Sequence, residues 1–519
     1  MKILTQNSNI KILLFIFALI SIIHVVYSTI TLRALTADGA SYMLCLLNSL
    51  SDNNYLPIVD NQHPRYFILS LLQIPVIFSY YVLKIQDKFA LLGVFSCVSY
   101  LFPILILWLE SFLANRNKRF DIFILSLFNY CLILLLYANC PIIESFIGSI
   151  FHFVLWEYLV AKFDYKKFDV VFITLLVVIM FSTFEYVVFL GPIFFFASLY
   201  YAKQTESGLN KKIKLFIGTG ALFAAVYNLI FMLSIPNEGG EIARFFSEFY
   251  DFFFNWANLN ITISFLAVFF LVLVFKRNTL FGKGQVVSLA AIFVIAFLRL
   301  FLNLSMSLCP LLEQHMRSIS CYTIPLIFLL LWIIDIKNIK VSEIKMQNFM
   351  CIILLCGITQ TCWQLVHCYY FDQNIQFMKK ELAKSEKLLY VPEEHEEISG
   401  IKNNQLHRYI YPSIFAATSI LFSENYEQKV LLSHYFTPID FVTFRNRLFV
   451  VKNPSGSQNG IISIPQDSYV RIKNRFWDLT ECAKAVEQDN NEKNIKEDFY
   501  NTTRNWVFIN SEKALKNHQ

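Results

Sequence analysis

Charged residues are scarce in this sequence, since only 16% of its 519 residues are Asp, Glu, Lys or Arg. Soluble globular domains carry about 25%, so the composition argues against a soluble protein. Apolar residues are correspondingly abundant: the chain is 56% hydrophobic, holds 53 Phe and has a mean hydropathy of +0.49. They come in runs long enough to cross a bilayer, which takes about 20 residues per helix. Because the backbone in lipid must satisfy its own hydrogen bonds, these runs are predicted to be helices. The sequence therefore predicts a polytopic α-helical membrane protein.

The sequence also lacks paired CxxC motifs and a small-residue cleavage site after its first apolar run. All cysteines except Cys482 lie within or beside apolar runs, so they are predicted to be buried small hydrophobes rather than disulfides or metal ligands. Residues 10–32 are predicted to be an uncleaved first helix rather than a secretory signal. The net charge of +6 is spread over short basic clusters between apolar runs. That pattern is typical of topology signals, and no nucleic-acid partner is expected.

Twelve apolar segments are candidates for membrane spans. They are 10–32, 67–83, 89–110, 122–139, 145–161, 168–184, 186–202, 213–235, 259–275, 286–304, 318–334 and 348–370. The second segment differs from the others because it is short, begins after His63-Pro64-Arg65 and contains Pro75. Whether it crosses the membrane decides on which side every later loop lies.

The distribution of Lys and Arg favours a model in which 67–83 lies in the membrane interface. With the N-terminus inside, five basic loops then become cytoplasmic: 115–121, 162–167, 203–214, 276–284 and 335–345. Together with Lys2 and Lys11 they hold eighteen Lys and Arg, against six in the outer loops: Arg33, Arg65, Lys84, Lys88, Arg244 and Arg317. Cytoplasmic loops are enriched in these residues. The alternative is twelve spans with the N-terminus outside, which also places the five loops inside but puts Thr36–Phe67 in the cytoplasm.

The predicted architecture has about 11 transmembrane helices and a cytoplasmic N-terminus. Residues 1–370 form the transmembrane domain, whose first outer loop, 33–88, holds short amphipathic helices near 39–50 and 65–83. Residues 371–519 are predicted to form a small extracytoplasmic soluble domain of the α/β or α+β class, with strands near 387–391, 429–436, 447–451 and 460–464. The Asn- and Lys-rich composition suggests an AT-rich genome, and we expect a bacterial inner membrane.

The predicted outer loops share a second feature: each holds a polar or charged side chain beside the end of an apolar helix. These candidates are Asp38, Glu144, Glu185, Glu313, His315 and Arg317. In the predicted topology they all lie at one end of the helix bundle. A carboxylate can act as general base toward a hydroxyl, and arginine can hold a phosphate through two parallel hydrogen bonds. The pattern favours transfer of a group from a lipid phosphate, met at the interface by an amphipathic helix.

One stretch of the first outer loop resembles the GT-C superfamily of membrane glycosyltransferases. The relatives in question are the protein O-mannosyltransferases of glycosyltransferase family 39 and the lipid A aminoarabinose transferases. These families carry a motif like DE-x-x-Y just after the first span; in "ADGASY" Asp38 and Tyr42 match, whereas Gly39 stands in the place of the Glu. The resemblance implies Asp38 as the base that binds the acceptor and Tyr42 as a residue of the acceptor cavity. It leaves both a divalent metal and no metal as alternatives, because the Glu is replaced.

Two further elements carry the same resemblance. His63-Pro64-Arg65 stands where the families open a juxtamembrane helix with His-Pro-Pro or Lys-Pro. "RSISCYTIP", with Arg317, is similar to a late R-Y-x-x-P element. The resemblance implies that His63, Arg65 and Arg317 bind the phosphate of a polyprenyl-phosphate sugar donor, and that the acceptor is a lipid, a glycan or a protein.

Each of these residues also has a purely structural interpretation. Asp38 can solvate a helix end, His63 and Arg65 can anchor the chain to headgroups, and Glu313, His315 and Arg317 can form a local ion-pair cluster. Glu157, inside an apolar run, is expected to pair with polar neighbours that hold the bundle together. Two other function classes stay open: a transporter or flippase, for which paired halves and charges at mid-depth are expected, and a non-enzymatic membrane scaffold or sensor.

Overall fold

The computed structural model describes the helical part of the chain and short pieces of its C-terminal part. The residues described are 8–36, 38–51, 66–132, 144–183, 186–234, 316–337, 343–384, 389–390, 415–424, 430–431, 439–444, 447–452, 469–471, 473–481 and 484.

Helices dominate the described residues, as the apolar runs predict. They are α2 (Ser8–Ile30), α3 (Asp38–Ser51), α4 (Tyr66–Tyr81), α5 (Lys88–Asn117), α6 (Phe120–Leu132), α7 (Glu144–Val160), α8 (Lys167–Met180), α9 (Val187–Lys203), α10 (Gly208–Ser234), α15 (Met316–Ile336), α16 (Glu343–Lys384) and α18 (Phe415–Phe422), with a 3₁₀ turn η1 (Arg33–Leu35). Every candidate span within the described residues coincides with one of these helices. The candidates 259–275 and 286–304 lie outside the described residues, and the number of membrane crossings stays a prediction.

Four helices in the described part of the chain are long and apolar enough to cross a bilayer. Their apolar stretches are Ile10–Ile30, Lys88–Asn117, Gly208–Phe231 and Phe349–Lys380. Large apolar side chains also point outward, among them Phe15 (70% exposed), Trp108 (72%) and Phe223 (68%). A soluble monomer rarely exposes contiguous apolar surface of this kind, whereas lipid covers it at no cost. These features are those of a helical membrane protein.

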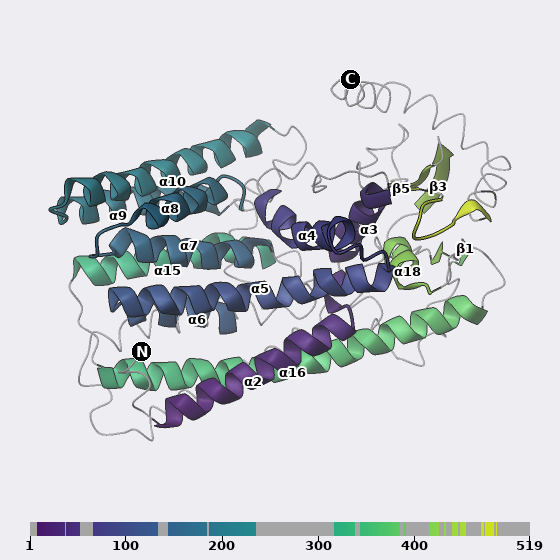
Figure 1. Cartoon of the computed structure of the whole chain (residues 1–519), viewed down its shortest axis with the longest axis horizontal. Helices are drawn as coiled ribbons and strands as arrows, with labels where there is room; N and C mark the ends of the chain where they lie inside the picture. The colour runs from purple at the N-terminus through teal and green to yellow at the C-terminus, as the bar shows by residue number, and fades with distance from the viewer. Residues whose placement is uncertain are drawn as a thin grey trace, which may run out of the picture. The chain divides into compact units, whose positions relative to one another are not determined.

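The chain forms two compact units. Unit 1 comprises Met1–Ser28, Gln62–Leu72 and Cys97–His367, and unit 2 comprises Thr29–Asn61, Gln73–Ser96 and Cys368–Gln519. In unit 1, α7 packs on α8, α9 and α15, and α10 packs on α8 and α9, which Figure 1 shows as neighbouring ribbons. The division of the chain at residue 370 stays a prediction.

An aromatic cluster joins three helices at the centre of unit 1. The ring of Trp156 on α7 lies 5.0 Å from Phe194 on α9 and 5.3 Å from Phe328 on α15, measured between centroids. Phe328 also lies 4.6 Å from Phe153, one turn earlier on α7. All four side chains are fully buried. Aromatic pairs at such distances contribute about 0.5–1.5 kcal/mol each beyond the area that they bury, so this cluster fixes how α7, α9 and α15 pack.

Helices α9 and α10 lie very close to each other at Gly191. A Cβ added at this glycine would lie 2.4 Å from the backbone oxygen of Ala221 and 2.6 Å from the Cβ of Ala225. Only a residue without a side chain fits there. Small residues at helix contacts are typical of membrane proteins, where close backbone approach supplies much of the packing energy.

Unit 2 holds the strands. β3 (Ile439–Phe444) pairs antiparallel with β4 (Arg447–Lys452), which pairs antiparallel with β5 (Tyr469–Arg471). β1 (Leu389–Tyr390) pairs parallel with β2 (Val430–Leu431). The predicted strands 387–391 and 429–436 contain β1 and β2, and 447–451 coincides with β4 except for its last residue. β3 was not predicted, and 460–464 lies outside the described residues. A separate C-terminal soluble domain stays a prediction.

Gly191→Ala is expected to destabilise the protein in detergent, because the added methyl group meets backbone that cannot rotate away. Overpacking of this kind costs about 1–3 kcal/mol. The measurement is the thermal unfolding midpoint. Gly93→Ala is the matched control, because a Cβ at this glycine of α5 meets nothing within 4 Å. If both variants unfold at the same temperature, α9 and α10 do not pack as closely as the structure shows.

Candidate functional site

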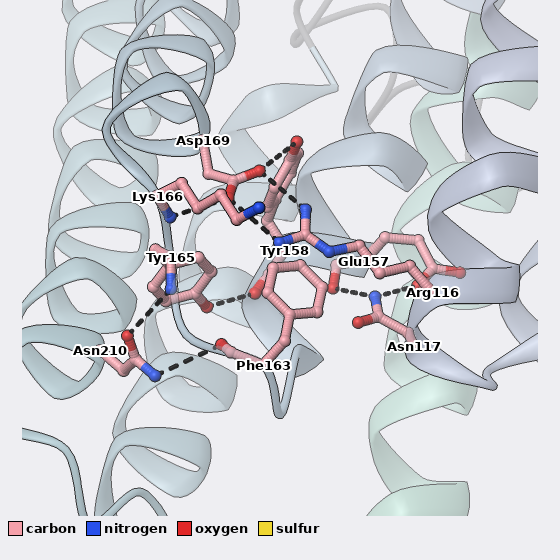
Figure 2. Close-up of polar contacts among 9 residues, drawn as sticks. All are labelled: Arg116, Asn117, Glu157, Tyr158, Phe163, Tyr165, Lys166, Asp169 and Asn210. Carbon is pink, nitrogen blue, oxygen red and sulfur yellow. Dashed lines mark hydrogen bonds and ion pairs between the residues drawn. The ribbon is translucent and has the colours of Figure 1, made fainter.

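A network of charged and hydrogen-bonded side chains closes one end of unit 1. Arg116, in the last turn of α5, donates to both carboxylate oxygens of Asp169 in α8, at 3.0 and 3.3 Å. The guanidinium also stacks on Phe163, 3.5 Å from the ring centroid. Asp169 further accepts from the backbone N–H of Lys166 at 2.9 Å and from the Tyr158 hydroxyl at 3.3 Å. Figure 2 shows these groups converging on the Asp169 carboxylate, which has no free lone pair to offer a substrate.

The connection between α7 and α8 is held by the same network. The Tyr165 hydroxyl donates to the carbonyl oxygen of Tyr158 at 2.6 Å. Asn210, at the start of α10, accepts from the Tyr165 N–H at 3.3 Å and donates to the Phe163 carbonyl oxygen at 3.3 Å (Figure 2). Backbone groups that the α7–α8 turn leaves without helical partners are therefore satisfied by one amide from a third helix.

Arg119 binds two carboxylates on the neighbouring side of this end. It donates to Asp121 at 2.7 and 2.9 Å and to Asp335, near the end of α15, at 3.1 Å. Asp335 also accepts from the Tyr201 hydroxyl of α9. Burial opposes the charge on Arg119, but the hydrogen bond and charge of Asp121 and the charge of Asp335 outweigh it and raise the pKa of the guanidinium. Arg119 thus stays charged and ties α6, α9 and α15 together.

These contacts join four of the five basic loops that the sequence places in the cytoplasm. Arg116 and Arg119 belong to 115–121, Phe163 to 162–167, Asn210 to 203–214, and Asp335 to 335–345. We call this end of unit 1 the basic end. Its two arginines are paired with carboxylates, Arg116 with Asp169 and Arg119 with Asp121 and Asp335, which suits an anchor of the bundle better than a site of chemistry. Within the described residues, no group of three His, Cys, Asp or Glu is arranged to hold a metal ion.

The other ends of the same helices carry several of the sequence candidates, and we call this region the opposite end. Glu144 is the first residue of α7, thirteen residues before Glu157, which is about 20 Å along a helix. Arg317 stands in the first turn of α15, eighteen residues before Asp335, or about 27 Å. Both positions therefore lie far from the basic end. The side chains of Glu144 and Arg317 are outside the described part of the structure.

A backbone contact brings the chain after His63-Pro64-Arg65 to this opposite end. The N–H of Phe67, in the first turn of α4, donates to the carbonyl oxygen of Ser182 at 3.1 Å. The Phe67 ring also lies edge-on to Phe151 of α7, 5.9 Å between centroids. Ser182 begins the short stretch that leads to Glu185. The first turn of α4, Ser182 and α7 thus meet.

A buried histidine and a tyrosine fasten the same turn to α7. The Nδ1 atom of His152 lies 2.9 Å from the Tyr186 hydroxyl, and both side chains are buried. One turn earlier, a Cβ at Gly148 would lie 2.0 Å from Thr183, so only glycine lets the turn come this close. Gly148 and His152, four residues apart on α7, therefore both face the turn before α9.

The remaining candidates are placed only in part. Asp38 is the first residue of α3 in unit 2, with its side chain outside the described part, and Tyr42 is buried one turn later. His63, Arg65, Glu185, Glu313 and His315 lie outside the described residues. The structure brings the backbone near several predicted site residues together, and their roles stay predictions.

Sequence reasoning missed the pairing at the basic end and one buried acid. Glu157 accepts from the Asn117 amide at 2.6 Å, as the prediction of a polar neighbour requires. Glu110 of α5 is fully buried near Ser126 and in electrostatic reach of Glu157, yet neither of its oxygens makes a well-formed hydrogen bond within the described chain. The signal for it was present, because Glu110 follows an apolar run of α5 that contains no other charge after Phe89.

Comparison of the chain with known protein families, with characterised proteins and with solved structures gives no match. The function of this protein therefore has to follow from its residues and their geometry.

Replacing Arg116 by Met and Asp169 by Asn, singly and together, is expected to give a non-additive loss of stability. Each single variant leaves the other charge partly buried without its partner, so the double variant should lose less than the sum of the two. The coupling free energy should be about 0.5–3 kcal/mol, measured by thermal or denaturant unfolding in detergent. Lys118→Met, at an exposed position between Arg116 and Arg119, should change stability by less than about 0.5 kcal/mol. Strict additivity would mean that the ion pair contributes nothing.

Proposed function

We propose that this protein is an integral membrane glycosyltransferase that uses a sugar linked to a polyprenyl phosphate. The acceptor is a hydroxyl of a lipid, a glycan or a protein on the extracytoplasmic side. The proposal joins the order of motifs after the first helix, Asp38 to Tyr42 and then His63 to Arg65, with the way in which the described helices meet. One observation carries it: the hydrogen bond from Phe67 to Ser182 supports a site in which the segment after Arg65 meets the Glu185 turn and α7.

The contacts of α4 support a placement along the outer interface. At its start, Phe67 contacts Ser182, which belongs to a loop that the charge rule places outside. At its end, the Tyr80 hydroxyl accepts from Arg475 at 3.2 Å, and Arg475 belongs to the C-terminal segment that the same rule places outside. A helix placed along the interface in this way is suited to meet the headgroup of a lipid donor.

In the proposed reaction Asp38 takes the proton of the acceptor hydroxyl as its oxygen attacks the anomeric carbon of the sugar. The bond between that carbon and the phosphate oxygen breaks, and the polyprenyl phosphate leaves with its electron pair. Arg65 or Arg317, with His63, would hold the leaving phosphate, whose negative charge grows as the bond breaks. Gly39 stands where the related families have a second acid, so one carboxylate that could bind a metal ion is missing. The reaction is therefore written without a metal, and a divalent ion stays an alternative.

Asp38→Asn is expected to lower transfer of a radiolabelled sugar from its polyprenyl-phosphate carrier by a factor of about 10²–10⁴, with normal expression. The amide keeps the shape of the side chain but cannot accept the proton. Asp87→Asn is the matched control from the same predicted outer loop: Asp87 is exposed and caps the N–H of Ala90 at 2.7 Å, and asparagine caps as well as aspartate. Full transfer activity in Asp38→Asn would rule out the assignment of Asp38 as base.

The buried carboxyl of Glu110 favours a second candidate, a transporter. Ionisable groups inside membrane helices are costly and often mark paths of protons or ions. Glu110 on α5 and Glu157 on α7 are both fully buried and close enough to interact electrostatically. Such a pair supports a proton or cation path through the bundle, for which a transferase has no need.

Glu110→Gln separates the two candidates. If the protein is a proton-coupled transporter, this variant should abolish the proton flux that a pH-sensitive dye reports in proteoliposomes, because glutamine cannot carry a proton. If the protein is a transferase, neither the natural protein nor the variant should carry such a flux, and transfer activity should persist in Glu110→Gln. Ser126→Ala, which removes only the neighbouring hydroxyl, is the matched control.

A further inference from the structure

Helix α3 is buried on nearly every side, which a helix on a membrane surface would not be. Ala40, Met43, Leu46, Leu47 and Leu50 each have no exposed surface. An interfacial amphipathic helix keeps a polar face in water, as the sequence predicts for residues 39–50. In unit 2, α3 instead contacts η1, α18 and β5. Two of these three elements come from the C-terminal part of the chain, so that part covers the helix that Asp38 begins.

A compact turn, residues 473–480, makes the first of two polar attachments. Asn474 accepts from the N–H groups of Phe476 and Trp477 at 2.7 and 3.1 Å, and its amide donates to the side-chain oxygen of Asn48 on α3 at 3.2 Å. Trp477 is fully buried. Hydrogen bonds from Lys473 and Thr480 lower the pKa of Asp478 to about 2, so the turn keeps its internal ion pair across the physiological range. It is a preformed surface that presents one amide to α3.

Lys88 makes the second attachment. Lys88 is only 9% exposed, and its ammonium group donates to the carbonyl oxygens of Ile420 at 3.1 Å and Ser423 at 2.6 Å. These carbonyls belong to the C-terminal end of α18, where the last turn leaves acceptors without helical partners and a cation is favoured. Lys379 of α16 pairs with Glu424 directly beyond, at 2.7 Å. A lysine more than 330 residues earlier in the chain thus caps α18.

We propose that residues 415–423 and 473–480 form a clamp that positions α3, and that Lys88 is the residue that holds the clamp closed. The docking surface is the face of α3 around Asn48, the end of α4 at Tyr80, and Lys88, and its occupant is the C-terminal segment of the same chain. The clamp requires that the first outer loop and the C-terminal segment lie on the same side of the membrane. Its effect on catalysis rests on the proposed function, because α3 carries Asp38; the docking itself does not.

Cross-linking tests the docking without any substrate. Asn48→Cys and Asn474→Cys are combined in the full-length protein in its membrane, treated with a short bis-maleimide, and analysed by mass spectrometry of the linked peptides. We expect a linked pair of peptides carrying residues 48 and 474, absent from each single variant. Labelling of both cysteines with a monofunctional maleimide but no linked peptide would overturn the proposal.

The role of Lys88 is tested by the accessibility of α18. Thr418, fully buried in α18, is replaced by Cys, and the rate of maleimide labelling at this position is followed by mass spectrometry. Lys88→Met should raise this rate by about tenfold or more, because both carbonyls lose a charged donor, and Lys88→Arg should restore the slow rate. Lys84→Met is the matched control, since Lys84 is exposed and four residues away. Equal rates in Lys88→Met and Lys84→Met would overturn the assignment of Lys88.

Transfer activity then tests whether the clamp positions α3 for catalysis or only attaches the C-terminal segment to it. Lys88→Met should lower the turnover of the proposed reaction, with recovery in Lys88→Arg, whereas Lys84→Met should leave it unchanged. Unchanged turnover in a Lys88→Met protein whose α18 is labelled quickly would overturn the positioning role. If the natural protein transfers no sugar at all, the proposed function fails, while the cross-linking and labelling results still decide whether the clamp exists.

Discussion

The bidentate ion pair between Arg116 and Asp169 is the interaction on which the packing of unit 1 depends. A membrane helix can end in charge only where that charge is solvated or paired. Here the pair joins α5 to α8, and the stacking of Arg116 on Phe163 adds the turn after α7. Once these ends are fixed, the basic end cannot slide relative to the aromatic cluster of Trp156, Phe194 and Phe328. The direction of each helix then determines which residues lie at the opposite end.

Much of this helical architecture could be predicted from the sequence, because it follows from one constraint. Long apolar runs between basic clusters must be helices, and each candidate span within the described residues is one. The shared position of the basic loops also follows from charge. The ion-pair partners at the basic end could not be predicted from the sequence. Asp169 and Asp335 look like ordinary acids at helix ends, and only the fold brings Arg116 and Arg119 to them. The same holds for Glu110, whose isolation depends on what α6 and α7 place around it.

The first outer loop shows the limit of local patterns more clearly. The prediction of an amphipathic helix near 39–50 is correct about the helix, yet the sequence does not show what covers it. Trp477 and Asn474 lie more than 400 positions later, in a segment whose charged composition suggested an independent domain. Residues 415–423 and 473–480 instead share a compact unit with α3. For the candidate site, the sequence indicated which loops to compare, and the contact between Phe67 and Ser182 shows two of them meeting, whereas the roles of Asp38, His63 and Arg65 rest on resemblance.

In the ion pairs that join distant segments at the basic end, as far as the structure describes it, the cation precedes the anion along the chain. Arg116 is made before Asp169, and Arg119 before Asp335. Since a chain emerges from its N-terminus, each arginine is synthesised before the carboxylate with which it pairs. When the later carboxylate is synthesised, its positively charged partner is therefore already present. For Asp169 and Asp335 the order of residues is thus also an order of assembly, in which each acid follows an arginine that is already part of the chain.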